Sequence, residues 1–387
     1  MKKLITEDKK AFLDDMLKRI TEALQLNETR RKLVEDRYKS VSIFIEGTPG
    51  LFFDAKIYSQ GSYRLGTTVK PRQGEEYDLD FVVQIHKNWK TLSFSEVYNS
   101  FKDLIESDDR WKDLVIEKPR CIRLNYADEF HMDIISTCTE NIQGDINRIM
   151  VPDRAEHRWG ISNPEGYALW FEKKYIAQRN IYLSDFYPGM EFRAALDLPK
   201  DDPNYLKQPL QHAVQLIKRY RDVYFEKQME MAPSSIVLTT LVAKMYEGEN
   251  SIYETIQKVV ERFRMAVETD KLYYRQFHVS NPVLPDEIFT KEWDKNPRLF
   301  DAFVLFMKSL YEFWEKLHTS TGPDLFNLLK DNFGTGAFDS AYKSQGLFMQ
   351  SLRDKGYTGI IKGTGMAGIG AGHQIQKDRP NTFHSDE

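Results

Sequence analysis

Cysteine is almost absent from this chain of 387 residues, in which only Cys121 and Cys138 occur. Two thiols form at most one bridge, so the sequence excludes a disulfide framework of the secreted kind and a four-cysteine zinc ribbon. Such sparse cysteine is typical of proteins from a reducing compartment. We therefore expect a cytoplasmic protein.

Long hydrophobic runs are also missing. No stretch approaches the roughly 18 uninterrupted apolar residues of a membrane-spanning helix, and no apolar segment follows the two lysines near the start. We therefore expect neither a membrane span nor a secretory signal. A hydrophobic fraction of 41% and a charged fraction of 29% are typical of soluble globular proteins. The length is sufficient for two packed lobes.

The chain lacks an excess of positive charge, and its formal net charge is −4. Proteins that grip a long phosphate backbone usually show a basic excess or stripe. We interpret the short basic clusters as solvated helix faces; they are Arg30-Arg31-Lys32, Lys173-Lys174, and Lys218-Arg219 with Arg221. Stable binding of long DNA or RNA is not expected. Nucleoside triphosphates remain compatible partners, because metal ions and a few side chains neutralise them.

The periodicity of apolar residues predicts a mixed α/β region between two helical regions. Helical spacing predicts a helix over 6–25 and a second one that begins after an N-cap at Asn27. Strand patterns follow at 55–62, 77–85, 121–126 and 130–136, with a helix at 93–107 and a turn at 127–129. Further wide apolar stripes predict helices at 167–178, 210–225, 234–246, 251–265 and 300–317.

Three aspartates carry the strongest chemical signal. Asp78 and Asp80 are two apart on an expected strand, so both carboxylates project to the same face. Their mutual repulsion is usually offset by a hard cation such as Mg²⁺. Asp133 lies in another apolar strand and joins the same site if the two strands are neighbours. The alternative is a solvated pair of carboxylates on a sheet edge.

A glycine-serine turn precedes these aspartates. Gly61 and Ser62 follow an expected strand, where backbone N–H groups and a hydroxyl can cradle a phosphate. Gln60 and Arg64 are near enough in sequence to reach phosphate oxygens. The alternative is a simple turn, which is what most glycine-serine pairs form when taken alone.

The ordered series of these motifs resembles the polymerase-β-like nucleotidyltransferase superfamily. The extended pattern GSYRLGTTVKP…YDLDFVV resembles, more narrowly, the bacterial relatives of cyclic GMP-AMP synthase and oligoadenylate synthase, the CD-NTases of anti-phage signalling. Similar stretches are also WGISNPEGYALWF, LIKRYRD with PSSIVLTTL, and NPVLPDEIF. The resemblance covers about residues 5–330.

The resemblance implies a bilobed α/β (α+β) fold, a polymerase-β-like mixed sheet with a helical C-terminal lobe. The expected divisions are N-terminal helices across the lobes at 1–50, a catalytic core at 51–160 and an oligoadenylate-synthase-like helical lobe at 161–335. The glycine-rich segment 356–387 is expected to be a flexible tail. A tail-binding partner is the alternative, although the C-terminal glycine through which some relatives are conjugated is not found here.

The resemblance also implies a chemistry. Asp78, Asp80 and Asp133 would bind Mg²⁺ or Mn²⁺, while Lys218 and Ser235 would contact the triphosphate. The alternative for the last two is a surface lysine and a helix-capping serine. The implied enzyme joins nucleoside triphosphates such as ATP and GTP into a cyclic di- or trinucleotide, with release of pyrophosphate. Its product would act on a separate effector protein during phage infection.

Two other functions are compatible with the same motifs. One is a nucleotidyltransferase that modifies RNA ends or a protein side chain, and the other is an inactive nucleotide-binding scaffold. Arg123, on the strand expected beside that of Asp133, either neutralises phosphate charge or is an exposed strand arginine. The bases used, the linkage and the ring size are left open.

Overall fold

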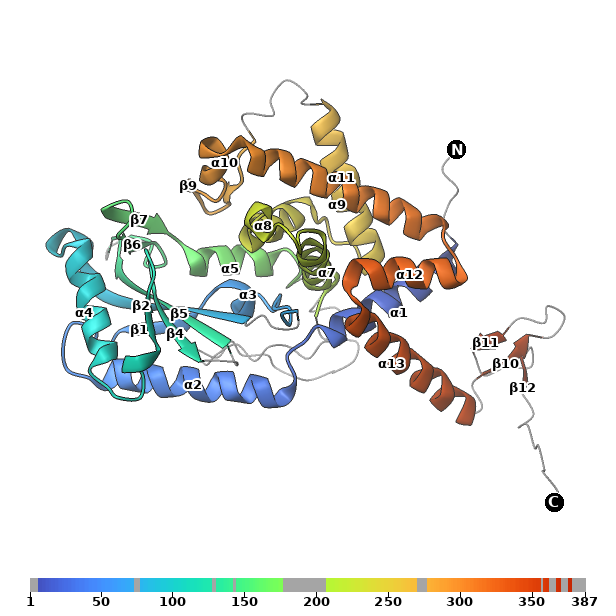
Figure 1. Ribbon diagram of the computed structural model, residues 1–387, viewed down its shortest axis with the longest axis horizontal. Helices are drawn as coiled ribbons and strands as arrows, with labels where there is room; N and C mark the ends of the chain where they lie inside the picture. Colours follow the sequence, from blue (N-terminus) through green and yellow to red (C-terminus); the bar gives the residue numbers. More distant parts are fainter. Residues whose placement is uncertain are drawn as a thin grey trace, which may run out of the picture.

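A computed structural model describes residues 6–72, 77–126, 130–141, 144–176, 207–269 and 277–355, with three short strands further on. The predicted turn at 127–129 and most of the predicted tail lie outside the described residues. A mixed sheet forms one side of the molecule and a group of helices the other (Figure 1). Within the described ranges, no helix has the length and apolar character needed to cross a membrane.

Among the residues that the structure describes, seven strands form the central sheet. Its main path runs β1 (Lys56–Ser59), β2 (Tyr77–Asn88), β5 (Phe130–Thr139), β4 (Ile122–Tyr126) and β3 (Val115–Glu117). At the end of β5 it is extended by β6 (Ile149–Asp153) and β7 (Arg158–Ser162). Strands β2 and β5 are parallel, whereas the other pairs are antiparallel. The predicted α/β class with a mixed sheet is confirmed.

One face of this sheet is covered by α2 (Glu28–Gly47) and α4 (Phe94–Glu106). Alternate residues of β2 project into this core: Leu79, Phe81, Val83 and Ile85. Because neighbouring residues of a strand point to opposite faces, Asp78 and Asp80 lie on the other face. The apolar alternation of β2 thus decides on which side of the sheet its carboxylates are found.

Local signals define where these two helices begin. The side chain of Asn27 accepts a hydrogen bond from the Arg30 N–H at 2.8 Å, so the predicted N-cap is confirmed. Helix α4 begins with a capping box between Ser93 and Glu96. Each such cap stabilises a helix by about 1 kcal/mol.

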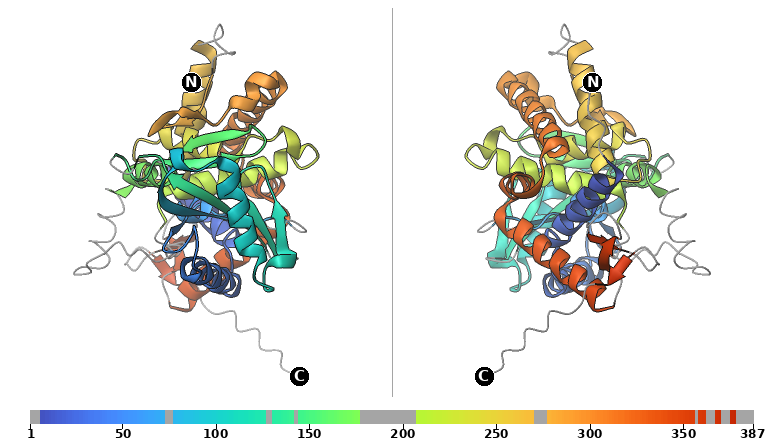
Figure 2. Two further views of the ribbon diagram at one scale, coloured as in Figure 1. Left: turned by 90° about the vertical axis from the view of Figure 1, so that its left-hand side faces the viewer. Right: turned by 90° about the vertical axis from the view of Figure 1, so that its right-hand side faces the viewer.

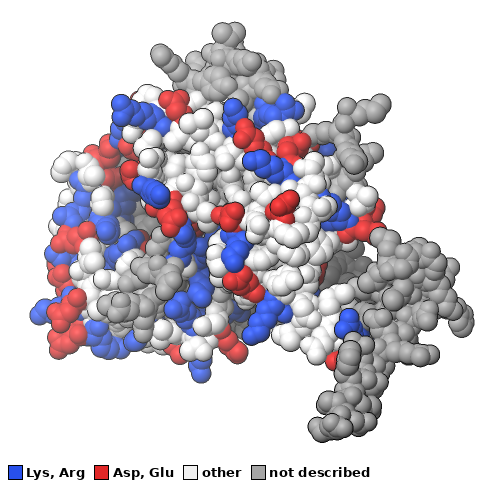
Figure 3. Space-filling view, turned by 45° about the vertical axis from the view of Figure 1, so that its right-hand side comes forward, with Lys and Arg blue, Asp and Glu red and all other residues white. Residues whose placement is uncertain are grey.

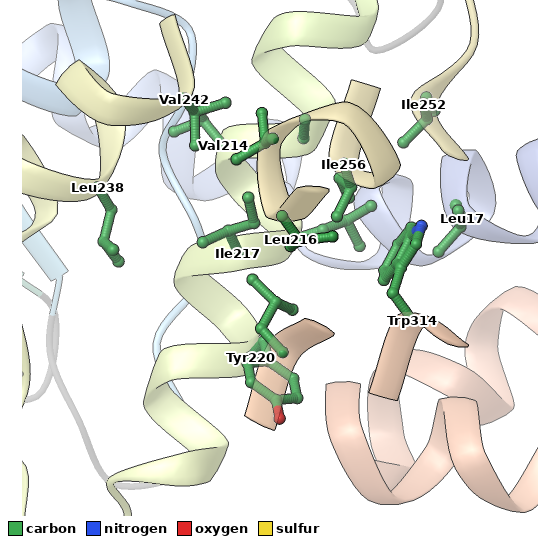
Figure 4. Close-up of a cluster of buried hydrophobic side chains, with 14 of the residues drawn as sticks. Leu17, Val214, Leu216, Ile217, Tyr220, Leu238, Val242, Ile252, Ile256 and Trp314 are labelled. Atoms are coloured by element: carbon green, nitrogen blue, oxygen red, sulfur yellow. The ribbon is translucent and has the colours of Figure 1, made fainter. Parts of the chain in front are cut away.

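Helix α7 (Pro209–Tyr224) is at the centre of the second core. Its apolar residues Val214, Leu216, Ile217 and Tyr220 pack among side chains of several other helices, and Trp314 is fully buried in the same cluster (Figure 4). The other helices of this core are α1 (Glu7–Ala23), α5 (Pro164–Lys173), α8 (Ser235–Met245), α9 (Ile252–Thr269), α11 (Pro297–Thr319), α12 (Gly322–Phe333) and α13 (Thr335–Asp354).

The two N-terminal helices belong to different cores. Helix α1 packs with the helical group and lies alongside α13 (Figure 2), whereas α2 packs against the sheet. A short connection at 24–27 joins them. This part of the chain therefore links the sheet to the helical lobe.

Several elements differ from the sequence-based expectation. A hairpin of β8 (Ser280–Asn281) and β9 (Leu284–Ile288), followed by α10 (Lys291–Lys295), interrupts the helical lobe. Helix α13 continues the lobe beyond its predicted limit at 335. Three-residue helical turns are found at Trp89–Thr91, Lys112–Leu114 and Met229–Met231.

The predicted flexible tail contains three short antiparallel strands, β10 (Thr358–Ile361), β11 (Ala367–Ile369) and β12 (Ile375–Lys377). Each of these strands contains isoleucine, which favours extended backbone. Parts of the tail therefore form strands, although its glycine content predicts a flexible segment.

Charges of both signs cover the surface. On the face drawn in Figure 3, Lys and Arg side chains are interspersed with Asp and Glu. This agrees with the small net charge of −4.

Candidate active site

The three aspartates meet on one face of the sheet because their strands are neighbours in register. Asp80 of β2 is directly opposite Asp133 of β5, and Asp78 is opposite His131. Paired backbones in a sheet lie roughly 4.8 Å apart. All three carboxylates therefore project from one small area, on the face that α2 and α4 leave uncovered.

Arg123 of β4 lies between two of these carboxylates. Its Nε donates to Asp133 Oδ1 at 2.7 Å, and its Nη2 donates to Asp133 Oδ2 at 2.8 Å and to Asp78 Oδ1 at 3.3 Å. These hydrogen bonds, above all those to Asp133, raise the pKa of Arg123 further above its already high value. The arginine is thus a resident positive charge of the site, rather than the exposed strand arginine of one expectation.

The negative charge of Asp80 is less well compensated than that of Asp133. Removal from water, reinforced by the negative charges of Asp133 and Asp78, raises the pKa of Asp80 to about 7. A carboxyl group perturbed in this way is common where a site is built to receive a cation or a proton.

Gly61 brings the glycine-serine turn into contact with Asp80. It starts the single-turn helix α3 (Gly61–Arg64) with a φ of +63°, and a Cβ at this position would lie 2.5 Å from Asp80 Oδ2. The N–H of Gln60 donates to the backbone carbonyl of Asp80 at 2.8 Å. Only glycine satisfies both the backbone conformation and the close approach.

A pocket of about 580 Å³ separates this turn from the helical lobe. Gly61, Ser62, Asp78 and Asp80 line it on the sheet side. Residues of α7, of the segment before α8 and of α8 itself line the opposite side, among them Lys218, Arg221, Asp222, Ser234 and Ser235. A volume of this size is within the range of small-molecule sites.

Lys218 is buried in the wall of the pocket, with only 5% of its surface exposed. Burial first, and then the neighbouring charge of Arg221, lower the pKa of Lys218 to about 7. Its Nζ donates to the carbonyl and to the hydroxyl of Thr67, both at 3.3 Å. An incoming anion would restore the charge of this lysine.

Ser235 is the first residue of α8, and its Oγ accepts a hydrogen bond from Arg221 Nη1 at 2.9 Å. The capping position belongs to Ser234, whose side chain makes no cap hydrogen bond. The serine pair therefore faces the pocket beside an arginine.

Gln60 and Arg64 are not among the residues that line the pocket. The Arg64 guanidinium forms ion pairs with Glu172 and, at 3.4 Å, with Glu165 on α5. These contacts direct it toward the helical lobe and away from the expected phosphate. The prediction that Arg64 contacts phosphate has no support in this arrangement.

The donor set fits a hard divalent cation, because carboxylate oxygens are the ligands that Mg²⁺ and Mn²⁺ prefer. In the part of the chain that the structure describes, however, no three Asp, Glu, His or Cys side chains form a ready-made metal cluster. Both oxygens of Asp133 are bound to Arg123. A cation held by all three aspartates must therefore share the oxygens of Asp133 with Arg123 or displace it.

One expectation about α7 is wrong. The sequence predicts a solvated helix face for the Lys218-Arg219 cluster, but both residues are almost fully buried. The reason is that α7 is enclosed on nearly all sides. The signal was the series of polar residues at helical spacing, at 211, 215, 218, 219 and 222, on a helix that is otherwise apolar.

Comparison with known proteins shows which family has this arrangement. A family model described as the Second Messenger Oligonucleotide or Dinucleotide Synthetase domain matches residues 12–174. The chain is 32% identical to a c-di-GMP synthase from Roseivirga ehrenbergii, over 99% of this chain and 100% of that protein. It is 26% identical to the cyclic dinucleotide synthase CdnG of Bradyrhizobium diazoefficiens, over 89% of this chain and 87% of that protein.

Solved structures share the fold. The structure of CdnG from Bradyrhizobium diazoefficiens in complex with GTP superposes with a TM-score of 0.68 at 23% identity, covering 86% of this chain and 99% of that one. Escherichia coli DncV, in its 3′-deoxy GTP bound form, gives a TM-score of 0.53 at 18% identity and covers 86% of this chain and 88% of that one. The chain belongs to the bacterial CD-NTases, a family of nucleotidyltransferase enzymes that make cyclic oligonucleotides from nucleoside triphosphates.

Proposed function

We propose that this enzyme joins two GTP molecules into cyclic di-GMP, with Asp78, Asp80 and Asp133 at the reacting phosphate. The observation that carries the proposal is the in-register placement of Asp80 beside Asp133, next to the Gly61-Ser62 turn. The choice of GTP and of a two-unit ring rests on the whole-length similarity to the c-di-GMP synthase of Roseivirga ehrenbergii.

The chain's own residues would act mainly by positioning and electrostatics. Ser62, Lys218 and Ser235 would hold the β- and γ-phosphates of the donor nucleotide from opposite walls of the pocket. Asp133 would orient the acceptor hydroxyl and help to take up its proton. Attack of that oxygen on the α-phosphorus breaks the bond to the β-phosphate and releases pyrophosphate. A second transfer closes the ring, so two GTP yield one cyclic product and two pyrophosphates.

Asp78, Asp80 and Asp133 would hold Mg²⁺, or Mn²⁺ in its place. When bound, such a cation neutralises phosphate charge and favours deprotonation of the attacking hydroxyl. Arg123 would first release Asp133, and its guanidinium would then be free to face a phosphate. The raised pKa of Asp80 is in keeping with a carboxyl group that awaits a positive partner.

The test is an incubation of the purified chain with each labelled nucleoside triphosphate and Mg²⁺ or Mn²⁺. We expect a phosphatase-resistant product from GTP alone. Turnover should fall by about a thousandfold or more in the double variant Asp78→Asn with Asp80→Asn, because the charge that holds the cation is lost. A chelator should have the same effect on the unaltered enzyme.

A matched control changes two aspartates remote from the site, Asp103→Asn with Asp109→Asn, and should keep full activity. Undiminished turnover in the Asp78/Asp80 variant would contradict the catalytic assignment. Labelled polymer or labelled protein would instead favour transfer to RNA ends or side chains, and tight nucleotide binding without pyrophosphate release would favour an inactive scaffold.

We also propose that the product acts on a separate effector protein during phage infection, and that the enzyme works in the cytoplasm. This rests on the family to which the chain belongs. Phage plaque counts on a native host, compared between the unaltered gene and the Asp78/Asp80 variant, test it. Equal plaque counts would contradict the defence role.

A further inference from the structure

One side of α7 is polar and yet almost completely buried. Gln211, Gln215, Lys218 and Arg219 are spaced at i, i+4, i+7 and i+8, so they share one side of the helix. Gln215 has no exposed surface at all. Buried polar side chains of this kind are costly unless they are hydrogen-bonded.

Each of them donates to one segment, the loop at 65–72 that follows the glycine-serine turn. The four side chains donate to four of its backbone carbonyls: Gln211 to Leu65 at 3.0 Å, Gln215 to Thr68 at 2.7 Å, Lys218 to Thr67 at 3.3 Å, and Arg219 to Lys70. The loop is neither helix nor strand. Side chains of α7 therefore supply the partners that regular secondary structure would otherwise provide.

The same loop is bound to the phosphate-cradling serine. The N–H of Thr67 donates to the Ser62 carbonyl at 2.9 Å, and the Thr68 hydroxyl donates to Ser62 Oγ at 3.4 Å. The carbonyls of Thr67 and Thr68 are held by α7 as described above. Ser62 is thus connected to the core helix of the other lobe through two consecutive residues.

We propose that Gln215, assisted by Gln211, is a positioning residue for triphosphate binding: it holds the loop at 65–72 so that Ser62 faces the pocket. Gln215 acts through the loop and is not itself among the residues that line the pocket. This inference rests on the proposed function for the identity of the ligand. It assigns to the helical lobe control over the geometry of the phosphate site.

The arrangement also makes the two lobes interdependent. Helix α7 packs against α1, α8, α9, α11 and α12, so a shift of the helical lobe moves α7 and the carbonyls that it holds. A loop fixed by four donors of a single helix follows that helix as a unit. Triphosphate affinity is therefore sensitive to packing in the helical lobe at a distance from the phosphate.

The test replaces Gln215 by methionine, which has a similar volume but no N–H donor. Two quantities are measured on the full chain with Mg²⁺: the Kd of a GTP analogue with a methylene bridge between its α- and β-phosphates, and the hydrogen exchange of backbone amides at 65–70. We expect Gln215→Met to weaken binding about tenfold, the effect of one lost buried hydrogen bond. Exchange at 65–70 should become faster.

The matched control is Gln84→Met. Gln84 is an equally buried glutamine of β2, and it donates to Thr139 Oγ1 at 3.0 Å and to the Ile146 carbonyl at 2.9 Å. Its replacement should lower the melting temperature comparably, with the analogue's Kd and the exchange at 65–70 unchanged. Gln211→Met provides the same test should Gln215→Met not fold.

Analogue affinity within twofold of the unaltered chain, or an equal loss in the Gln84 variant, would overturn the positioning role. Different results would contradict the proposed function and the positioning role of Gln215. A lack of cyclic product from the unaltered enzyme contradicts the proposed function, whereas unchanged exchange at 65–70 in Gln215→Met contradicts the inference whatever the product.

Discussion

At the scale of single residues, the site is a balance of charges that are only partly paired. Arg123 neutralises Asp133 and reaches Asp78, while burial is the main cause that brings the pKa values of Asp80 and Lys218 to about 7. Unmatched groups of this kind cost stability in the free enzyme. Binding of a cation and a triphosphate removes that cost, so the same residues favour the bound state.

Lys218 gives this balance a measurable pH dependence. The folded, ligand-free enzyme holds its amine at a pKa of about 7, against 10.5 in the unfolded chain. Between these values the unfolded chain binds the extra proton, so the free energy of unfolding rises with pH. We expect Lys218→Met to be more stable than the unaltered chain by the largest margin below about pH 7, and this margin to shrink as the pH rises toward about 10.

Denaturant unfolding at a series of pH values, without metal or nucleotide, measures that margin. Lys227→Met, at an exposed position after α7, is the control and should show no such trend. A margin independent of pH would mean that the buried lysine is charged in the free enzyme.

At the scale of elements, the short path from β1 through α3 determines how near a phosphate comes to the carboxylates. Its close contact is between Gly61 and Asp80. Position 61 must adopt a positive φ, and it must also leave room for a carboxylate oxygen at contact distance. These are two separate demands. Both are met by the absence of a side chain.

Gly61→Ala violates both demands, and a glycine subject only to the first demand separates them. An added methyl group should displace the Asp80 carboxylate and lower kcat by at least about tenfold, beyond a backbone cost of about 1 kcal/mol. Gly322→Ala is the matched control, because Gly322 has a φ of +54° and open space where a Cβ would be. It should lose similar stability and keep its kcat. Equal activity in both variants would show that the Asp80 contact is unimportant for turnover.

At the scale of the whole molecule, two cores share one pocket, and several polar contacts join them. Besides the hydrogen bonds of α7, the pair of Arg64 with Glu172 links α3 to the helical lobe, where the two side chains are 15% and 29% exposed. Such partly buried pairs hold the lobes at a defined separation.

An exchange of charges tests whether Arg64 links the lobes or contacts phosphate. Arg64→Glu should destabilise the fold by about 1–3 kcal/mol, because it places like charges together. The double variant Arg64→Glu with Glu172→Arg should recover most of the melting temperature and also the Kd of the GTP analogue. Recovered stability with binding still lost would mean that Arg64 contacts the triphosphate after all.

Much of the site was predictable from local patterns. The alternation in YDLDFVVQI places Asp78 and Asp80 on one face, and the strand pattern around Asp133 places its carboxylate opposite the apolar residues of β5. Arg123 could not be assigned in the same way, because a strand arginine in the sequence has no known neighbour. Nor could the burial of Gln215 be predicted, since helical spacing does not say what a polar face meets.

The sequence by itself determined the type of the strands that carry the three aspartates and the face on which each carboxylate projects, because these follow from backbone geometry over a few residues. Only the tertiary structure decided that β2 and β5 are parallel neighbours, that Arg123 rests between two aspartates, and that α7 holds the loop at 65–72. These contacts join residues far apart in the chain, and the packing of two cores brings them together.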